Sequence, residues 1–288
     1  MRGLLSAIAA SRARSMPELL DRLAAPAPPR LIAGGTDVMV QLEAGLLADV
    51  PLFLDLTALA TDLRYLRMDD DALEIGALAT FRDVRQRADI VAAFPLLEQS
   101  ARTIGATQIQ TRGTWAGNIA NGSPAADGVA ALLACDAEVV LMSTAGRRTT
   151  PLHGFFTGYK KMEMGPGEFI AAIRLPRTAP DRFHEFWKVG TRRAQAITKV
   201  GLTIRWLADG SWRMVGTSLA PFVARYDVLE KLFADSGDHP ERLDAQQLAA
   251  AGAAAVMPID DIRSTAAYRR RVVLNLLRDA AARCHDPA

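Results

Sequence analysis

Residues 111–127 read TRGTWAGNIANGSPAAD and hold three glycines, two asparagines and three hydroxyl side chains. A single positive charge, Arg112, precedes the closing Asp127. Glycine lets backbone amides approach a ligand closely or adopt positive φ, and hydroxyl and amide side chains can complete a polar cradle. This composition suits a phosphate group, and it equally suits an ordinary long turn. These residues alone leave both interpretations open.

Another glycine-rich joint, which we call the first cradle, lies earlier in the chain, where residues 31–37 read LIAGGTD. The apolar residues 31–33 predict a short buried strand, and Gly34 and Gly35 predict a tight turn. Thr36 is then expected to cap a helix. Such a joint directs free amides and a helix dipole at whatever lies above it, which favours an anion by roughly 0.3 to 2 kcal/mol.

Ser123 and Pro124 form a cap and first-turn pair, and the apolar run VAALLAC at 129–135 predicts the body of the helix that follows. The stretch 111–127, which we call the second cradle, is therefore also expected to lie at the start of a helix. Two amide-rich cradles suit two linked phosphates, which suggests a dinucleotide. The glycines form neither G-x-G-x-x-G nor G-x-x-x-x-G-K-[ST], so neither a Rossmann site nor a nucleotide triphosphatase is supported.

The composition of the chain excludes several classes of function. The chain has 288 residues, of which 50% are apolar and 23% charged, enough for a substantial core and two domains. Its 34 basic and 32 acidic residues form no basic stripe, so we expect no nucleic acid partner. Only Cys135 and Cys284 are cysteines, which excludes a disulfide framework or an iron–sulfur site on these residues.

Hydrolytic and metal sites are not indicated. The sequence lacks G-x-S-x-G and H-E-x-x-H, and its four histidines have no partner at a diagnostic spacing. The consecutive aspartates 69–71 lack the ligand spacing of a calcium loop and suit a solvated turn. We therefore predict no catalytic residue and no metal ligand on this chain.

The opening MRGLLSAIAASR weakly resembles a signal peptide, but its apolar run is brief and Arg12 and Arg14 follow at once. We expect an exposed amino-terminal segment. No apolar run reaches the length of a membrane span, and a cytoplasmic location is predicted.

The pattern of apolar residues predicts an α+β fold. Helices are expected at 16–23, 82–90, 95–104, 224–234, 243–254 and 265–282. Strands are expected at 31–33, 50–56, 65–68, 72–76, 138–143 and 168–176, and a meander at 182–189, 197–207 and 212–219. A loop is expected at 151–167. The organisation changes at Pro176, so we place a domain boundary near residue 177.

LIAGGTD at 31–37 and RGTWAGNIANGSPAAD at 112–127 closely resemble the two flavin-binding loops of the molybdenum hydroxylases, in the FAD subunit or domain of xanthine dehydrogenase and carbon monoxide dehydrogenase. FFTGYKK at 155–161, PGEFI at 166–170 and EFWKVGTRRAQAITKV at 185–200 extend the resemblance over nearly the whole chain. It implies an FAD-binding domain of the xanthine dehydrogenase type over 1–177, with subdomains of about 1–57 and 58–177. A carboxy-terminal domain with a three-stranded antiparallel sheet and helices would cover 178–288.

The resemblance also implies the residues that hold FAD. The first loop would wrap the pyrophosphate through backbone amides of Leu31, Ile32, Ala33, Gly34, Gly35, Thr36 and Asp37. The second side would be closed by Thr114, Gly117 and Asn118. Because a carboxylate repels phosphates, helix capping by the Asp37 side chain stays open as an alternative to a ligand contact.

Four further positions follow from the same resemblance. Asp127 matches an acidic residue that holds the adenosine part, Ile170 an apolar contact at the adenine, and Lys188 a basic residue beside the flavin. Ile104 stands where xanthine dehydrogenases carry an aromatic residue against the isoalloxazine, which leaves the stacking partner undefined.

In this family electrons pass from a molybdopterin centre through 2Fe-2S clusters to FAD, and then to NAD or another acceptor. The resemblance implies that this chain is the FAD-carrying medium subunit beside an iron–sulfur small subunit and a molybdopterin large subunit, as a heterotrimer or a dimer of heterotrimers. Two alternatives stay open. One is a stand-alone FAD-dependent oxidoreductase with Tyr159 lining its own substrate pocket. The other is a non-catalytic assembly module that has lost flavin, against which the intact glycines and Asn118 argue.

Overall fold

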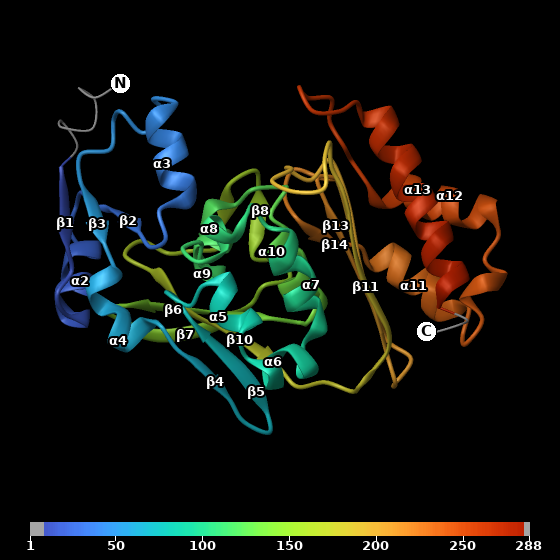
Figure 1. Ribbon diagram of the computed structural model, residues 1–288, viewed down its shortest axis with the longest axis horizontal. Helices are drawn as coiled ribbons and strands as arrows, with labels where there is room; N and C mark the ends of the chain where they lie inside the picture. Colours follow the sequence, from blue (N-terminus) through green and yellow to red (C-terminus); the bar gives the residue numbers. More distant parts are fainter. Residues whose placement is uncertain (1–8, 285–288) are drawn as a thin grey trace.

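The computed structural model describes residues 9–284. These residues form three larger sheets, each with its own helices, and one two-stranded hairpin (Figure 1). Of the amino-terminal segment that the sequence predicts to be exposed, residues 1–8 lie outside the described part, and Ala9 and Ala10 are exposed. No helix of the described residues is long and apolar enough to span a membrane.

The first part is a three-stranded parallel sheet in the order β1-β3-β2. Its elements are β1 (Ala10–Arg12), α2 (Met16–Leu23), β2 (Arg30–Ile32), α3 (Thr36–Glu43) and β3 (Phe53–Asp55). Helix α2 has the bounds that the sequence predicts, because Ser15 caps it by accepting the Glu18 N–H at 3.3 Å and Pro17 lies in its first turn. A strand, a glycine turn and a helix follow one another between β2 and α3 as predicted, but β2 is not the buried strand that was expected, since Arg30 is exposed and Leu31 and Ile32 are only half-buried.

The second part is a five-stranded antiparallel sheet in the order β4-β5-β10-β6-β7. Its strands are β4 (Leu66–Met68), β5 (Ala72–Gly76), β6 (Glu138–Ser143), β7 (Gly146–Pro151) and β10 (Phe169–Pro176). The sequence gives no apolar signal for β7, since this exposed edge strand reads GRRTTP. Within the predicted loop 151–167, the strands β8 (Phe156–Gly158) and β9 (Lys161–Met162) form a small hairpin.

Short helices precede and cover this sheet. They are η1 (Thr57–Leu59), α4 (Ala60–Leu63), α5 (Phe81–Arg85), α6 (Ala88–Ala93), α7 (Pro95–Thr103), α8 (Thr107–Gln110), α9 (Trp115–Asn121) and α10 (Asp127–Ala134). Three details differ from the sequence predictions. The helix expected at 82–90 is interrupted, since α5 ends at Arg85 and α6 begins only at Ala88. Residues 115–121 form helix α9 inside the stretch read as a loop, and Ser123 and Pro124 lie in the turn before α10 rather than at its start.

The third part is an antiparallel sheet in the order β11-β12-β13-β14, covered by helices on its outer face (Figure 1). Its elements are β11 (Asp181–Val189), β12 (Val200–Leu207), β13 (Trp212–Thr217), β14 (Ala224–Arg225), α11 (Asp227–Asp235), η2 (Pro240–Arg242), α12 (Ala245–Ala255) and α13 (Ala266–Arg283). The three long strands confirm the predicted meander. The two-residue β14 adds a fourth strand, and α11 consequently begins three residues later than the sequence suggested.

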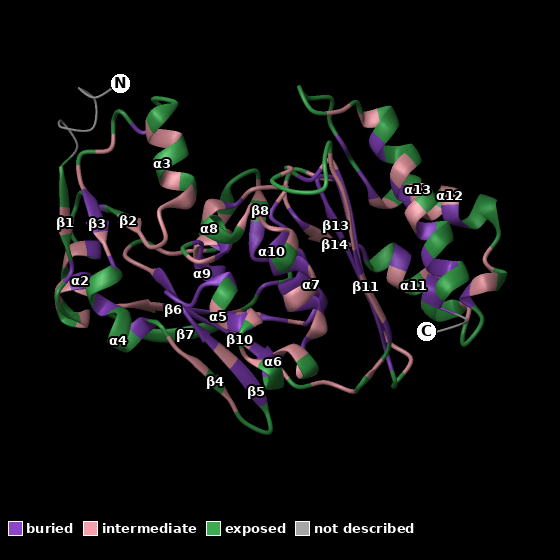
Figure 2. Ribbon diagram, viewed as in Figure 1, coloured by how far each residue is buried: buried purple, intermediate pink, exposed green. Residues whose placement is uncertain are grey.

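Helix α10 lies near the centre of the molecule (Figure 2), and strand β12 of the third sheet packs against it. All eight residues of each element are buried. Helix α10 packs on β12 and β13 from one side of the sheet, and α13 packs on β12 from the other. A helix or strand enclosed in this way is mostly apolar, which explains the run VAALLA of α10 and most of VGLTIRWL in β12; the buried Arg205 of β12 is paired with Asp181.

We propose domain bounds of 1–177 and 178–288, with the first domain divided near residue 57. The bounds rest on the strands: β10 ends at Pro176 and closes the five-stranded sheet, whereas β11 begins the next sheet at Asp181. Each side has a hydrophobic core of its own, although Phe186 and Val215 of the third sheet also pack into the first core across α10.

Candidate FAD site

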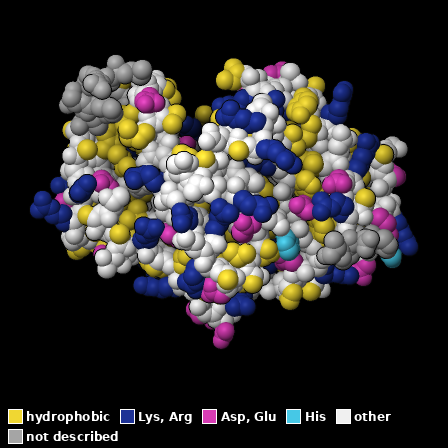
Figure 3. All heavy atoms as spheres, viewed as in Figure 1, with side chains coloured by type: hydrophobic (Ala, Val, Ile, Leu, Met, Phe, Trp, Pro, Cys, Tyr) yellow, Lys and Arg dark blue, Asp and Glu magenta, His cyan; other side chains and the backbone are white. Residues whose placement is uncertain are grey.

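Both glycine-rich loops line one cavity between α3 and α9, with a volume of about 180 Å³. Figure 3 shows the surface hollowed between the lobe that carries α3 and the body of the molecule. Eleven of the sequence-predicted residues line this cavity: Leu31, Ala33, Gly34, Gly35, Thr36, Asp37, Ile104, Thr114, Gly117, Asn118 and Ile170. The structure therefore brings together two loops that lie about eighty residues apart in sequence.

The start of α3 leaves backbone donors unused. Gly35 is the residue before the helix, with φ of 74°, and it offers no side chain to cap the first turn. Thr36 is thus the first helical residue and not the cap that the sequence suggested. In the described part of the chain, the N–H groups of Thr36, Asp37 and Val38 donate no hydrogen bond. Free amides at the positive end of a helix dipole form a site for an anion.

Gly34 is required for the two loops to touch. A Cβ atom at this position would lie 1.9 Å from the carbonyl oxygen of Arg112, which is backbone and cannot move aside. The Arg112 Nε also donates to the Gly34 carbonyl at 3.3 Å. The missing side chain of Gly34 therefore makes room for the second loop, and the first residues of α3 line the same cavity as α9.

The second loop is organised by helix α9. The Thr114 hydroxyl caps this helix by accepting the Gly117 N–H at 3.0 Å, and a Cβ atom on Gly117 would lie 2.7 Å from that hydroxyl. Asn118 uses its Oδ1 to accept the Val129 N–H of α10 at 3.2 Å. Thr114, Gly117 and Asn118 all line the cavity. In addition, Thr114 holds the start of α9 and Asn118 holds the start of α10.

Asp37 joins α3 to α9 and does not cap its own helix. Its Oδ1 accepts from Asn121 Nδ2 at 3.0 Å, and Asn121 Oδ1 accepts from Gln41 Nε2 at 3.1 Å. The capping alternative for Asp37 is therefore not realised. Asp37 lies at the cavity mouth, where partial burial raises the pKa of its carboxyl, although Lys160 and Asn121 oppose that rise.

A second, larger cavity of about 900 Å³ adjoins the first and shares with it Thr36, Asp37, Ile104 and Asn118, among others. Its volume lies within the range of small-molecule sites. It reaches the third sheet, because Lys188 and Thr198 line it as well as Asp127 of α10. The two cavities together form a continuous cleft from the glycine loops to the carboxy-terminal sheet.

Asp127 and Lys188, which the resemblance places at FAD, form a buried pair with each other. Asp127 Oδ2 lies 2.6 Å from Lys188 Nζ, and its Oδ1 accepts from the Thr198 hydroxyl at 2.5 Å. Lys188 also donates to the Thr103 carbonyl at 2.9 Å. Burial raises the pKa of Asp127, and Lys188 and Thr198 counteract the rise. Both Asp127 oxygens are thus held by groups of this chain.

Thirteen of the fourteen predicted residues line one of the two cavities, and Ile32, within β2, lines neither. The structure also adds residues that the sequence did not single out. Gln41 and Asn121 link the two cradles, and Thr198 completes the Asp127 pair. Asn121 and Thr198 both lie in stretches quoted for the resemblance, at 112–127 and 185–200, but the pairing of Thr198 with Asp127 spans 71 residues and has no local sequence signal.

Residues 6–178, which include both loops, match the family described as the FAD binding domain in molybdopterin dehydrogenase. The chain belongs to this family. The match covers more than half of the chain, and it confirms the resemblance that the two glycine loops suggested. FAD is accordingly the cofactor of this domain.

Curated relatives in the family are named as dehydrogenase subunits. The nicotinate dehydrogenase FAD-subunit of Eubacterium barkeri is 31% identical over 177 residues, which cover 60% of this chain and 59% of that protein. The glyceraldehyde dehydrogenase medium chain of Sulfolobus acidocaldarius is 28% identical over 271 residues, which cover 91% of this chain and 92% of that protein. These relatives class the chain as an oxidoreductase subunit.

The fold is confirmed by a solved structure of carbon monoxide dehydrogenase from Hydrogenophaga pseudoflava, in a form that lacks the Mo-pyranopterin moiety of the molybdenum cofactor. One of its chains superposes with a TM-score of 0.85 and 24% sequence identity, over 96% of this chain and 98% of that chain.

The residues present fit FAD. The unused amides of Thr36, Asp37 and Val38 suit a pyrophosphate, because they are donors at a helix amino terminus. Ile104 and Ile170 add apolar surface at the cavity wall that suits a planar ring. The described residues contain no cluster of histidine, cysteine or carboxylate side chains that could hold a metal ion.

Proposed function

We propose that this chain is the FAD-carrying electron-transfer subunit of a molybdopterin-dependent dehydrogenase or hydroxylase. It would receive electrons from 2Fe-2S clusters on a small partner subunit, with molybdopterin on a large subunit, and pass them to NAD or another acceptor. The names of the relatives as FAD subunit and medium chain support this role. A cytoplasmic location is part of the proposal, since both cysteines are free thiols, as in a reducing compartment.

One observation carries the proposal: the backbone amides of Thr36, Asp37 and Val38 donate to no group in the described residues, and they line the cavity that both glycine-rich loops share. When bound, FAD supplies the redox chemistry itself. The chain's own residues would hold it, with Thr36 to Val38 donating backbone amides to the pyrophosphate and Asp127 with Lys188 fixing the wall of the second cavity. The fourteen predicted positions remain our proposal for the site.

The second cavity is the observation that favours the alternative of a stand-alone oxidoreductase. Tyr159 is 61% exposed and lines this cavity, as a residue at an open substrate pocket would. The same opening equally serves a diffusible electron acceptor, and the relatives' names as subunits favour the latter use. A non-catalytic module that has lost flavin is disfavoured by the unused amides and by Gly34.

An anaerobic visible absorption spectrum of the purified chain, before and after addition of NADH, tests the proposal. We expect bound oxidised flavin, and bleaching by NADH would identify a nicotinamide as redox partner. Flavin that ignores NADH but is bleached by dithionite would point to another acceptor. A folded chain that neither retains FAD nor takes it up when FAD is added would contradict the proposed function.

A further inference from the structure

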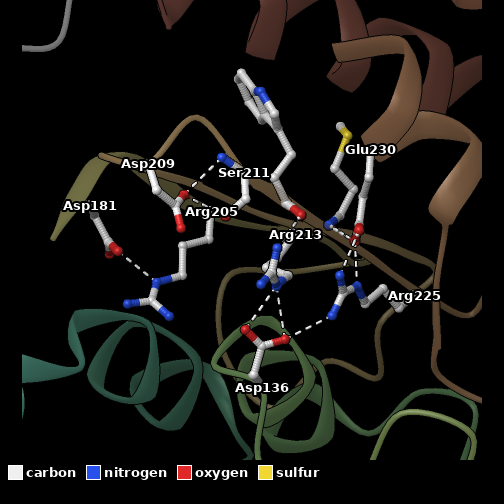
Figure 4. A network of polar contacts seen from close by, with 10 residues as sticks. Asp136, Asp181, Arg205, Asp209, Ser211, Arg213, Arg225 and Glu230 are labelled. Carbon is white, nitrogen blue, oxygen red and sulfur yellow. Dashed lines mark hydrogen bonds and ion pairs between the residues drawn. The ribbon is translucent and has the colours of Figure 1, made fainter. Parts of the chain in front are cut away.

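Helix α10 is tied to the carboxy-terminal part at both of its ends, and Figure 4 shows the contacts just past its carboxy-terminal end. At its start, Asp127 bonds Lys188 and Thr198 as described above. Just past its end, Asp136 accepts from Arg213 Nε at 2.8 Å to each oxygen, and from Arg225 Nη1 at 2.7 Å. A helix this short, held by a carboxylate at each end, has little freedom to rotate or slide against the sheet.

The anchor at Asp136 is itself rigid. Arg225 also makes a bidentate pair with Glu230, at 2.6 and 2.7 Å, and Glu230 accepts the Met214 N–H at 2.9 Å (Figure 4). The side chains of Arg213, Arg225 and Asp136 are only 16 to 23% exposed. Paired charges that are largely removed from water are costly to separate, since removing one leaves the other without a partner.

The backbone at Asp136 adds a second constraint. Its φ is 51°, in the left-handed region, which asparagine and aspartate tolerate better than other side chains apart from glycine. The chain turns back at this point, because Ala137 donates its N–H to the Leu132 carbonyl at 3.0 Å. The conformation aims the Asp136 carboxylate at both arginines.

At the other end, α10 reaches the cofactor site through its first turn. The Val129 N–H is bonded by Asn118 Oδ1, and Asn118 lines both cavities. The turn before α10 is fixed as well, since the Ser218 N–H donates to the Pro124 carbonyl at 2.7 Å. A shift of α10 would therefore displace Asn118 and the second cradle.

We propose that Asp136 is a positioning residue for the FAD site: it locks α10 to the carboxy-terminal sheet, and α10 in turn holds Asn118 in the second cradle. The proposal deepens the proposed function and rests on it. The third sheet then acts as part of the cofactor site although most of it lies away from the glycine loops. Asp136 touches neither cavity and acts only through the helix.

The test compares Asp136→Asn with a matched control, Asp181→Asn. Asparagine keeps the size and the tolerance for positive φ, so the first change removes the charge and one of the two acceptor oxygens that the arginines use. Asp181 pairs with the buried Arg205 at 2.6 Å within the same sheet, and in the described residues it bonds nothing on α10 (Figure 4). Two quantities are measured well below the melting temperature: the Kd for FAD, and hydrogen exchange at the Val129 amide.

We expect Asp136→Asn to raise the Kd for FAD roughly tenfold, a size typical of indirect coupling, and to speed exchange at Val129. Asp181→Asn should change neither, even if both variants melt earlier. Arg213→Gln, which removes one of two donors to Asp136, should give a smaller rise in Kd if Asp136→Asn does not fold. A change in melting temperature alone, or an equal change in both aspartate variants, would overturn the proposal.

If the wild-type chain binds no FAD, the proposed function fails, and exchange at Val129 still decides whether Asp136 holds α10. Faster exchange in Asp136→Asn than in Asp181→Asn would then support the positional lock, and equal exchange would refute it.

Discussion

Helices α3 and α10 are both eight residues long and both begin at the proposed FAD site, but their surroundings are opposite. Helix α10 buries all eight residues, whereas α3 buries none. The third amide of α10 is bonded by Asn118, while the first three amides of α3 donate to nothing in the described residues. Burial gives α10 a fixed position, and exposure gives α3 donors that a ligand can reach.

This difference indicates that the two cradles have different roles, one in binding the ligand and one in supporting the site. The first loop offers binding groups: a left-handed Gly35, no capping side chain, and a helix amino terminus that faces the cavity. The second loop offers support: Thr114 caps α9, Asn118 holds α10, and Asp127 reaches the third sheet. We therefore infer that α3 carries the main attraction for the pyrophosphate and that α10 sets where its partner loop lies.

The largest expected effect concerns stability. Leu132 of α10 has no exposed surface, so Leu132→Ala should lower the free energy of unfolding by about 2 to 5 kcal/mol through lost burial and a cavity. Val40 of α3 is 63% exposed, and Val40→Ala should change it by less than about 0.5 kcal/mol. Urea unfolding of both variants measures the contrast. Similar losses would erase the distinction between the helices.

The next effect concerns FAD affinity. Gly34→Ala forces a Cβ atom against the Arg112 carbonyl, so the loops must separate and the Kd for FAD should rise roughly 10- to 100-fold, as 1 to 3 kcal/mol of local strain implies. Gly158→Ala is the control, because a Cβ atom there meets only the Lys161 side chain at 3.7 Å. Fluorescence titration with FAD compares them. Unchanged affinity in Gly34→Ala would show that the loop contact does not shape the site.

The smallest effect is a pH dependence that sharpens the assignment of Asp37. Its pKa lies above the ordinary 3.8 because of burial. A nearby phosphate would repel the ionised carboxylate and raise that pKa further, so binding takes up a proton and the Kd for FAD should fall as the pH is lowered from neutral toward the pKa of Asp37. Asp37→Asn should flatten this trend. A Kd independent of pH in the wild type would place the phosphates away from Asp37.

Much of the fold followed from local sequence. Ser15 and Pro17 mark the start of α2. The acidic turn at 69–71 joins β4 to β5, and the turn with Asp209 and Gly210 joins β12 to β13. Helix α9 was missed because glycine and asparagine are weak helix formers, and it forms since Thr114 caps it and Trp115 is fully buried. Edge strand β7 was missed because its polar sequence lacks an apolar face.

Part of the candidate site could also be predicted from the sequence. The glycine joint at Gly34 and Gly35 indicated an anion cradle from its residues alone, whereas Asp127 and Lys188 came only from the family resemblance. No sequence pattern could show that these two residues form an ion pair, or that Asp136 meets Arg213 and Arg225, since the partners lie 61 to 89 residues apart. Such pairings depend on how α10 docks on the third sheet.

The most direct test of the central claim follows the backbone amides of Thr36, Asp37 and Val38 by NMR while FAD is added to isotope-labelled, flavin-free chain. We expect FAD to bind and these amide signals to shift strongly, because the donors gain a phosphate partner, while the signal of the exposed Leu46 stays in place. If FAD binds and the three amide signals do not respond, the amides of helix α3 do not hold the pyrophosphate, which would contradict the proposed site.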